Sequence, residues 1–160
     1  MAATFKGKYK PRNPEKYKGN PMLIEHRSSW EREFMKYCDL SEHVTQWSSE
    51  EKAIWYYDPI QKKKRRYFPD FIIQYEKNGL KYEEVVEIKP WRQVQGPPAN
   101  PKRRTQGWMR EVMTYATNQA KWKAARIWAE DRGMSFRLLT EKDVPGWSGS
   151  PTKPSTKRSK

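Results

Sequence analysis

The chain has 160 residues, and its 33 lysines and arginines against 19 aspartates and glutamates give a formal net charge of +14 at pH 7. A charged fraction of 32% and the lack of any apolar run of bilayer length exclude a bundle of membrane-spanning helices. Eight tryptophans, nine tyrosines and five phenylalanines imply a buried core, so the chain is expected to be a basic folded domain that binds a polyanion, most often nucleic acid.

The two ends of the chain differ in composition from its middle. Residues 1–21 hold basic residues and prolines without a helical or strand period, which predicts an extended basic arm. Residues 145–160 are rich in Pro, Ser, Thr, Gly and Lys, which is typical of a disordered basic tail. The predicted folded domain is therefore residues 22–144.

The first predicted element of this domain is a helix over residues 28–39. Ser28 and Glu31 fit a capping box at its start, and apolar residues then recur at helical spacing from Trp30. After a short loop, the β-branched and aromatic residues 53–57 predict a strand.

Two further strands are predicted on either side of a hairpin turn. Asn78-Gly79 is a strong signal for a two-residue hairpin, and it joins the predicted strands 66–75 and 80–88. Pro90 ends the second strand, because proline cannot donate to a sheet ladder. Together with residues 53–57, these strands are expected to form a three-stranded meander.

The remainder predicts a loop, a long helix and a last strand. Residues 91–104 contain three prolines and are expected to be a loop. A stripe of apolar residues at helical spacing predicts a helix over residues 105–132, with Gly133 as its stop. Residues 134–140 follow as a strand. The predicted fold class is mixed α/β (α+β), in the order α-β-β-β-α-β.

Two carboxylates and a lysine stand out in the predicted strands. Asp70 lies within an apolar strand, where a carboxylate is costly unless a cation or hydrogen-bond donors satisfy it. Glu87 and Lys89 lie two residues apart and so on one face of the partner strand. Because a tight hairpin joins the strands, Asp70 and Glu87 can converge and offer Mg²⁺ two hard oxygen ligands. Lys89 can then orient the attacking water or stabilise charge on a phosphate.

These residues resemble a known superfamily. Pro69-Asp70 followed by Glu87-Ile88-Lys89 is similar to the PD-(D/E)XK signature of magnesium-dependent nucleases, which implies a restriction-endonuclease-like core with a mixed sheet flanked by helices. The segments 27–34 and 65–71 resemble the endonuclease subunit of heteromeric transposases. Segments from residue 6 to residue 122 resemble, closer still, the family of head completion nucleases of T-even-like tailed phages.

The resemblance implies roles for individual residues. Asp70 and Glu87 would be the main metal ligands, with the backbone carbonyl of Ile88 as a further one, and Lys89 would be the catalytic lysine. The implied cofactor is Mg²⁺, with Mn²⁺ as a substitute. No glycine-rich phosphate loop is present, so no nucleotide cofactor is expected.

Two other implied roles have structural alternatives. The superfamily pattern assigns the first-helix acid of the metal site to Glu31, but Glu31 can also serve only the helix end, and Glu33 lies on the same turn. Gln119 is the candidate for a glutamine of the second helix that supports the site as a catalytic residue. Alternatively, it is only a polar residue beside the apolar stripe of that helix.

Two basic clusters are candidate contacts for DNA phosphates. Each can alternatively be a solvated turn or loop. They consist of Lys62, Lys63, Lys64, Arg65 and Arg66 in the first, and Lys102, Arg103 and Arg104 in the second.

The expected function is metal-dependent hydrolysis of phosphodiester bonds in double-stranded DNA by an endonuclease, with exonuclease activity left open. The resemblance implies that it cleaves or trims packaged DNA before heads join tails, beside portal or head–tail connector proteins, in the host cytoplasm or the virion, without a membrane partner. The alternatives are a non-catalytic, DNA-contacting structural factor of the capsid or portal, and a nuclease subunit of a recombination or transposition complex.

Overall fold

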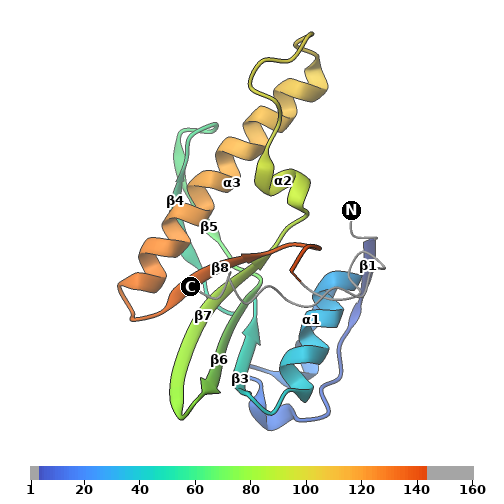
Figure 1. The fold of residues 1–160 in the computed structure, drawn as a ribbon, viewed down its shortest axis with the longest axis vertical. Coiled ribbons are helices and arrows are strands. Elements are labelled where there is room, and N and C mark those ends of the chain that lie inside the picture. Colours follow the sequence, from blue (N-terminus) through green and yellow to red (C-terminus); the bar gives the residue numbers. More distant parts are fainter. Residues whose placement is uncertain (1–3, 144–160) are drawn as a thin grey trace.

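The computed structural model describes residues 4–143, and helices cover a central sheet in it (Figure 1). The helices are α1 (Ser29–Leu40), α2 (Trp91–Gln95) and α3 (Gln106–Glu130), with short 3-10 turns η1 (Pro14–Lys16) and η2 (Pro21–Leu23). The strands are β1 (Thr4–Lys8), β2 (Glu25–Ser28), β3 (Val44–Ser49), β4 (Ile54–Asp58), β5 (Lys63–Tyr67), β6 (Phe71–Lys77), β7 (Leu80–Ile88) and β8 (Ser135–Leu139). The tail expected at residues 145–160 lies outside the described residues.

The central sheet has four strands in the order β3-β6-β7-β8. β3 and β7 are antiparallel to β6, whereas β8 is parallel to β7, because α3 carries the chain back along the sheet between them. The core therefore follows the order α1, β3, β6, β7, α3, β8. This is the α-β-β-β-α-β order and mixed sheet that the sequence predicts.

Two apolar cores lie on opposite faces of the sheet, because neighbouring residues of a strand point to opposite sides. Val86 belongs to the same core as Phe34 of α1, whereas Val85 belongs to the core that contains Trp122 and Ala125 of α3. Figure 1 shows α1 and α3 on the two sides of the sheet. The result is a three-layer arrangement in which the ends of the middle strands lie between two helices.

The predicted strand over residues 53–57 forms, but its expected place in a meander with the next two strands is wrong. β4 pairs only with β5, in a separate two-stranded ribbon beside α3, and β3 takes the expected place in the central sheet. β3 gives no strand signal because its sequence, Val-Thr-Gln-Trp-Ser-Ser, is mostly polar. Trp47 is nevertheless only 1% exposed, and it anchors β3 in the core beneath α1.

Two smaller predictions also need correction. The sequence predicts one strand over residues 66–75, but the chain forms β5 and β6 with a break at residues 68–70. Pro69 lacks a backbone N–H, which explains why the ladder stops there. The expected loop over residues 91–104 begins with the short helix α2.

The long second helix and the elements beside it are confirmed. α3 begins after Thr105, whose side-chain oxygen accepts a hydrogen bond from the backbone N–H of Trp108 at 3.0 Å. Gly133 follows its end with a φ of 73°, a conformation that favours glycine. β8 then forms where residues 134–140 predict a strand.

The segment before residue 22 packs against the rest of the domain. β1 pairs with β2, and Tyr17 is 6% exposed within the core beneath α1. The carboxylate of Asp39 on α1 holds this segment by accepting hydrogen bonds from the backbone N–H groups of Arg12 at 2.7 Å and Asn13 at 2.9 Å. The basic segment is therefore tied to α1, and it contains the 3-10 turns η1 and η2 as well as strand β1.

The helices of residues 4–143 include none with the length and apolar character that crossing a bilayer requires.

Candidate active site

Asp70 and Glu87 lie opposite each other where β6 begins and β7 ends. Phe71 pairs with Val86, so the next position outward in the same antiparallel register places Asp70 across from Glu87. The backbone N–H of Asp70 donates to Glu87 Oε1 at 3.2 Å, and the backbone N–H of Ile88 donates to Asp70 Oδ2 at 2.8 Å. Each carboxylate is thus held by the backbone of the other strand.

The hairpin turn sets this pairing. Lys77 pairs with Leu80, which leaves Asn78 and Gly79 as the two turn residues, with φ of 54° and 77°. Positive φ at both positions is the geometry of the two-residue turn that suits the twist of paired strands, and Asn-Gly adopts it readily. The turn fixes the register, and the register brings Asp70 to Glu87.

Burial gives the two carboxyl groups unusual proton affinities. Glu87 is only 4% exposed, and Asp70 is partly buried. Burial, then the charges of Glu87 and Glu31, hold the pKa of Asp70 well above its usual range. Burial also raises the pKa of Glu87, although the charge of Lys89 and the hydroxyl of Tyr67 act in the opposite direction. A cation between the two carboxylates would relieve this repulsion.

One oxygen of each carboxylate remains available for such a cation. Glu87 Oε1 accepts from the hydroxyl of Tyr67 at 2.6 Å as well as from the backbone of Asp70. Within the described part of the chain, Asp70 Oδ1 and Glu87 Oε2 accept no hydrogen bond. Residues 4–143 contain no cluster of three or more His, Cys, Asp or Glu side chains able to hold a metal. Two hard oxygens fit Mg²⁺, which commonly takes one or two carboxylates and keeps several waters.

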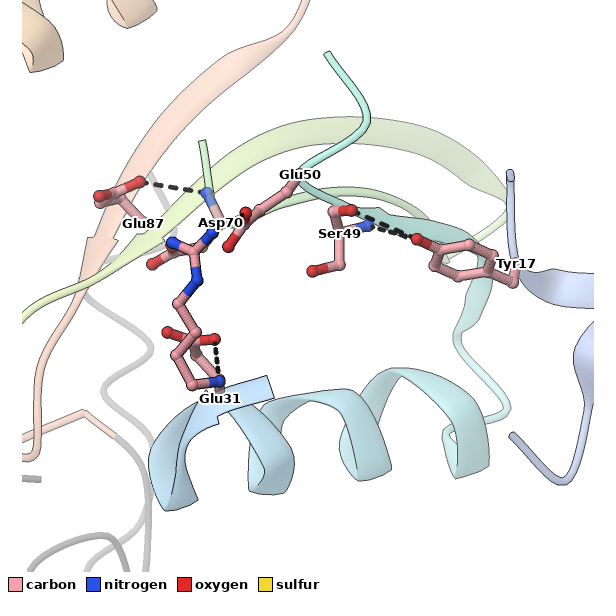
Figure 2. Close-up of polar contacts among 7 residues, drawn as sticks. Tyr17, Glu31, Ser49, Glu50, Asp70 and Glu87 are labelled. Carbon is pink, nitrogen blue, oxygen red and sulfur yellow. Dashed lines mark hydrogen bonds and ion pairs between the residues drawn. The ribbon is translucent and has the colours of Figure 1, made fainter. Parts of the chain in front are cut away.

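A second pair of acids lies on the α1 side of these carboxylates. Figure 2 shows Glu31 on α1 and Glu50, directly after β3, beside Asp70. Glu31 Oε1 accepts from the backbone N–H of Arg27 at 3.0 Å, and the guanidinium of Arg27 pairs with Glu50 at 2.7 Å. Burial raises the pKa of Glu50, with Arg27 opposing and Glu31 adding to the rise.

Glu31 therefore lies near Asp70 and also belongs to the helix start, and its role at a metal stays a prediction. Ser28 accepts from the backbone N–H of Glu31 at 3.1 Å, as a capping box requires, but the Glu31 carboxylate bonds to Arg27 rather than to Ser28. Glu33 is partly exposed and pairs with Arg32 and Lys36 on the helix surface.

Lys89 lies two residues beyond Glu87, at the end of β7. Its backbone N–H donates to the carbonyl of Leu139 on β8 at 3.0 Å, which ties the end of β7 to the sheet. Its side chain is partly buried, and its positive charge lowers the pKa of both Asp70 and Glu87. An ammonium group thus accompanies the two carboxylates.

Sequence reasoning missed Lys121 of α3, a second lysine near the carboxylates. Its ammonium lies 5.6 Å from the ring centroid of Tyr67 and 5.8 Å from that of Tyr56. Burial and the charge of Lys89 lower its pKa, while the charge of Glu87 raises it. The only available signal was its place two residues after Gln119 on the predicted helix. No sequence signal pointed to Glu50, because the strand before it was not predicted.

Gln119 lies apart from this group. It is exposed and lines a separate hollow with Val94 and Lys123. Two helix positions apart correspond to nearly opposite sides of α3, so Gln119 and Lys121 point in different directions. A supporting role for Gln119 stays a prediction.

The first basic cluster lies on the ribbon β4–β5 and the second in the loop before α3. Lys62 occupies the turn with a φ of 55°, and the other four residues of the cluster belong to β5. Lys102, Arg103 and Arg104 are exposed, and the guanidinium of Arg104 lies 5.7 Å from the ring centroid of Trp108. Both segments extend toward the same end of the long axis of the molecule (Figure 1).

Comparison with known proteins finds two matches that cover most of the chain. Residues 41–141, which include Asp70, Glu87 and Lys89, match the family described as TnsA-like endonuclease N terminal. The chain is also 40% identical over 141 residues to the head completion nuclease of Enterobacteria phage T4, across 86% of this chain and 91% of that protein. No solved structure gives a significant match.

Proposed function

Because the chain belongs to the TnsA-like endonuclease family, we propose that Asp70, Glu87 and Lys89 form a metal-dependent active site that cleaves DNA. The protein is a phage nuclease that acts in head completion, as its 40% identity to a head completion nuclease indicates. Its metal, its site residues and the DNA it cuts are the subject of the proposal.

The observation that carries the proposal is the facing pair Asp70 and Glu87. Both carboxyl groups have raised pKa values, primarily because of burial, and each is held by a backbone N–H of the opposite strand. A buried acid facing a partly buried one is costly in a folded protein unless a cation offsets their charge, so the presence of both here supports a metal site.

In this proposal Asp70 Oδ1 and Glu87 Oε2 hold Mg²⁺ or Mn²⁺, with the Ile88 carbonyl and Glu31 as further candidates. The bound metal would supply a Lewis acid that activates water and offsets charge on the scissile phosphate.

The remaining side chains of the site act on water and phosphate. Lys89 orients the attacking water or stabilises negative charge on the phosphate as the bond breaks. Tyr67 holds Glu87 in place through the bond to Oε1. Lys121 adds a second positive charge on the α3 side, where it can contact a neighbouring phosphate.

The biological step that fits this chemistry is the cleavage or trimming of packaged DNA before a filled head joins its tail. Portal or head–tail connector proteins are the proposed partners. The enzyme would then act in the host cytoplasm during assembly, or in the virion. Endonucleolytic cutting is proposed as the main activity, with exonucleolytic trimming as a further one.

The test is cleavage of supercoiled plasmid and linear duplex DNA with Mg²⁺, Mn²⁺ or EDTA. The wild-type protein should cut both substrates only when a metal is present, and cutting of the circle shows endonuclease activity. Asp70→Ala should abolish cutting while leaving the fold and DNA binding nearly unchanged. Glu83→Ala, which removes an exposed acid from the same strand as Glu87, is the matched control and should cut normally.

Two outcomes would contradict the proposal. Normal cutting by Asp70→Ala would remove this residue from the site. DNA binding without cutting under any metal would favour the alternatives, a structural DNA-contacting factor or a nuclease that works only inside a larger complex.

A further inference from the structure

The ribbon β4–β5 has an exposed face that the proposed active site leaves unused. Along β4, Ile54, Tyr56 and Asp58 are buried toward the body of the protein, as strand alternation requires. The residues between them point the other way, so the side chains of Trp55 and Tyr57 are 62% and 58% exposed. Two large aromatic rings in one exposed row are unusual on a domain surface, and such patches commonly mark a binding site.

Basic residues from β5 lie directly across from these rings. Trp55 pairs with Arg66 and Tyr57 pairs with Lys64 in the antiparallel register, and residues paired in this way project from the same face. These four residues are called the aromatic–basic face. Alternation therefore divides the basic cluster, since Arg65 pairs with the buried Tyr56 and projects from the other side.

The aromatic–basic face carries positive charge that acids do not offset. Among residues 4–143, neither Lys64 nor Arg66 forms an ion pair with an acid. The guanidinium of Arg66 lies 5.9 Å from the ring centroid of Phe68, which is itself 43% exposed. Exposed aromatic rings beside cations without acidic partners can bind an anionic polymer that also has flat apolar groups able to stack on the rings.

The position of the face links it to the active site. The base of the ribbon is the pair Ile54–Tyr67, and the hydroxyl of Tyr67 donates to Glu87 at 2.6 Å. Trp55 and Arg66 are the next pair outward, and Tyr57 lies about 7 Å further along the strand. These side chains project from the side of the ribbon opposite to that of Tyr67, so a nucleic-acid strand on this face would reach the carboxylates by passing around the base of the ribbon.

From this arrangement we infer that the aromatic–basic face binds unpaired nucleotides, so that the substrate is DNA with a single-stranded stretch beside the cleaved phosphate. The inference rests on the proposed nuclease function and narrows its substrate. Aromatic side chains bind single strands by stacking on base faces, with basic residues along the backbone. In an intact duplex the neighbouring bases already cover these faces, which leaves Trp55 and Tyr57 no surface on which to stack.

The test measures DNA binding in EDTA, where metal-dependent cutting cannot occur. The probes are a fluorescent oligothymidine, a blunt duplex and the same duplex with a single-stranded tail. Trp55→Ala with Tyr57→Ala should weaken binding to the oligothymidine and the tailed duplex by about tenfold or more, because each stacked ring contributes that order of affinity. Binding to the blunt duplex should change by less than about twofold on the same basis.

Two further variants separate stacking from other effects. Trp55→Phe with Tyr57→Phe keeps both rings and should retain most of the affinity for single strands. Tyr37→Ala removes a ring on α1 that is 54% exposed and should change binding to none of the probes. Thermal unfolding of each variant shows that the fold is kept.

The remaining results would overturn the inference. An equal loss of affinity for all three probes would mean that the face contacts duplex DNA in general. No loss of affinity for any probe would mean that the face does not bind DNA and would favour a protein partner. These measurements are independent of cleavage. Failure of the wild-type protein to cut DNA with metal would count against the proposed function, whereas the EDTA titrations decide the inference.

Discussion

At the scale of single residues, the dominant feature is the facing pair of Asp70 and Glu87, of which Glu87 is buried and Asp70 is partly buried. Asp70 and Glu87 both have raised pKa values, with burial as the largest cause, and Lys89 offsets only part of the effect. In the metal-free protein this pair should therefore cost stability, which can be measured apart from activity.

Asp70→Asn should raise the free energy of unfolding of the metal-free protein at neutral pH. Because the pKa of Asp70 is raised by folding, the folded protein binds more protons than the unfolded chain above about pH 4. Wild-type stability then falls as the pH rises toward the raised pKa, and the asparagine variant escapes this loss. Urea unfolding in EDTA across a pH series should show that the free energy of unfolding of Asp70→Asn equals that of the wild type near pH 4 and exceeds it increasingly toward neutral pH.

Glu83→Gln, at an exposed position of β7, is the control and should show no such trend. Adding Mg²⁺ should raise the unfolding midpoint of the wild-type protein, since a ligand that binds only the folded state stabilises it, but not that of Asp70→Asn. A loss of stability that is the same at every pH would mean that the variant only weakens the hydrogen bond from Ile88.

The two first-helix acids can be told apart by one substitution each. Glu31→Gln keeps the acceptor for the backbone of Arg27 but removes the negative charge near Asp70, so plasmid cleavage should fall by about tenfold or more if that charge contributes about 1.4 kcal/mol. Glu33→Gln removes only surface ion pairs and should cut normally. Equal rates for both variants and the wild type would reduce Glu31 to a helix-capping residue.

At the scale of elements, one buried acid of α1 makes several of the hydrogen bonds that attach the N-terminal segment to this helix. Asp39 is fully buried, and its carboxylate accepts from the hydroxyl of Tyr9 at 2.8 Å and from the backbone N–H groups of Arg12 and Asn13. A carboxylate in such a position organises chain that has no helical or strand period of its own.

Asp39→Ala should lower the free energy of unfolding by roughly 3 kcal/mol, because it leaves backbone donors without a partner. Urea unfolding measures the loss, and limited proteolysis should show faster cutting before residue 22. Glu42→Ala, at an exposed position shortly after α1, is the matched control and should change stability little. Resistance of Asp39→Ala to both assays would show that β1 and Tyr17 hold the segment without it.

At the scale of the whole molecule, the net charge of +14 is spread over surfaces that can contact DNA at more than one place. The ribbon β4–β5 and the loop with Lys102, Arg103 and Arg104 both extend toward one end of the long axis (Figure 1). The indole N–H of Trp108 on α3 donates to the carbonyl of Pro98 in this loop at 2.8 Å, which fixes the loop against the helix.

Replacing Lys102, Arg103 and Arg104 by glutamine should weaken duplex binding and make it less sensitive to salt. If each residue contacts one phosphate, the slope of log K against log salt concentration should become shallower by about 2 to 3. The measurement is duplex binding over a salt series in EDTA. Lys77→Gln with Lys81→Gln, at the exposed β6–β7 turn, is the control, and an equal effect there would indicate charge alone rather than a specific contact.

The sequence by itself determined the features that depend on neighbouring residues. Asn78-Gly79 sets the hairpin and its register, and the register alone places Asp70 across from Glu87, which is why a two-residue turn could predict the pairing. The start of α1 at Ser28 and the stop of α3 at Gly133 are also local, because caps act through adjacent backbone groups.

Only the tertiary structure decided what depends on contacts between distant segments. The polar strand β3 joins the sheet because Trp47 is buried beneath α1 and β6 offers it a ladder, neither of which its own sequence reveals. The approach of Glu50 and Lys121 to the carboxylates follows from how β3 and α3 pack on the sheet. Strand period and caps act over a few residues, whereas the burial of both sheet faces joins segments far apart in the chain. The positions of Glu50 and Lys121 near the carboxylates were therefore decided by packing.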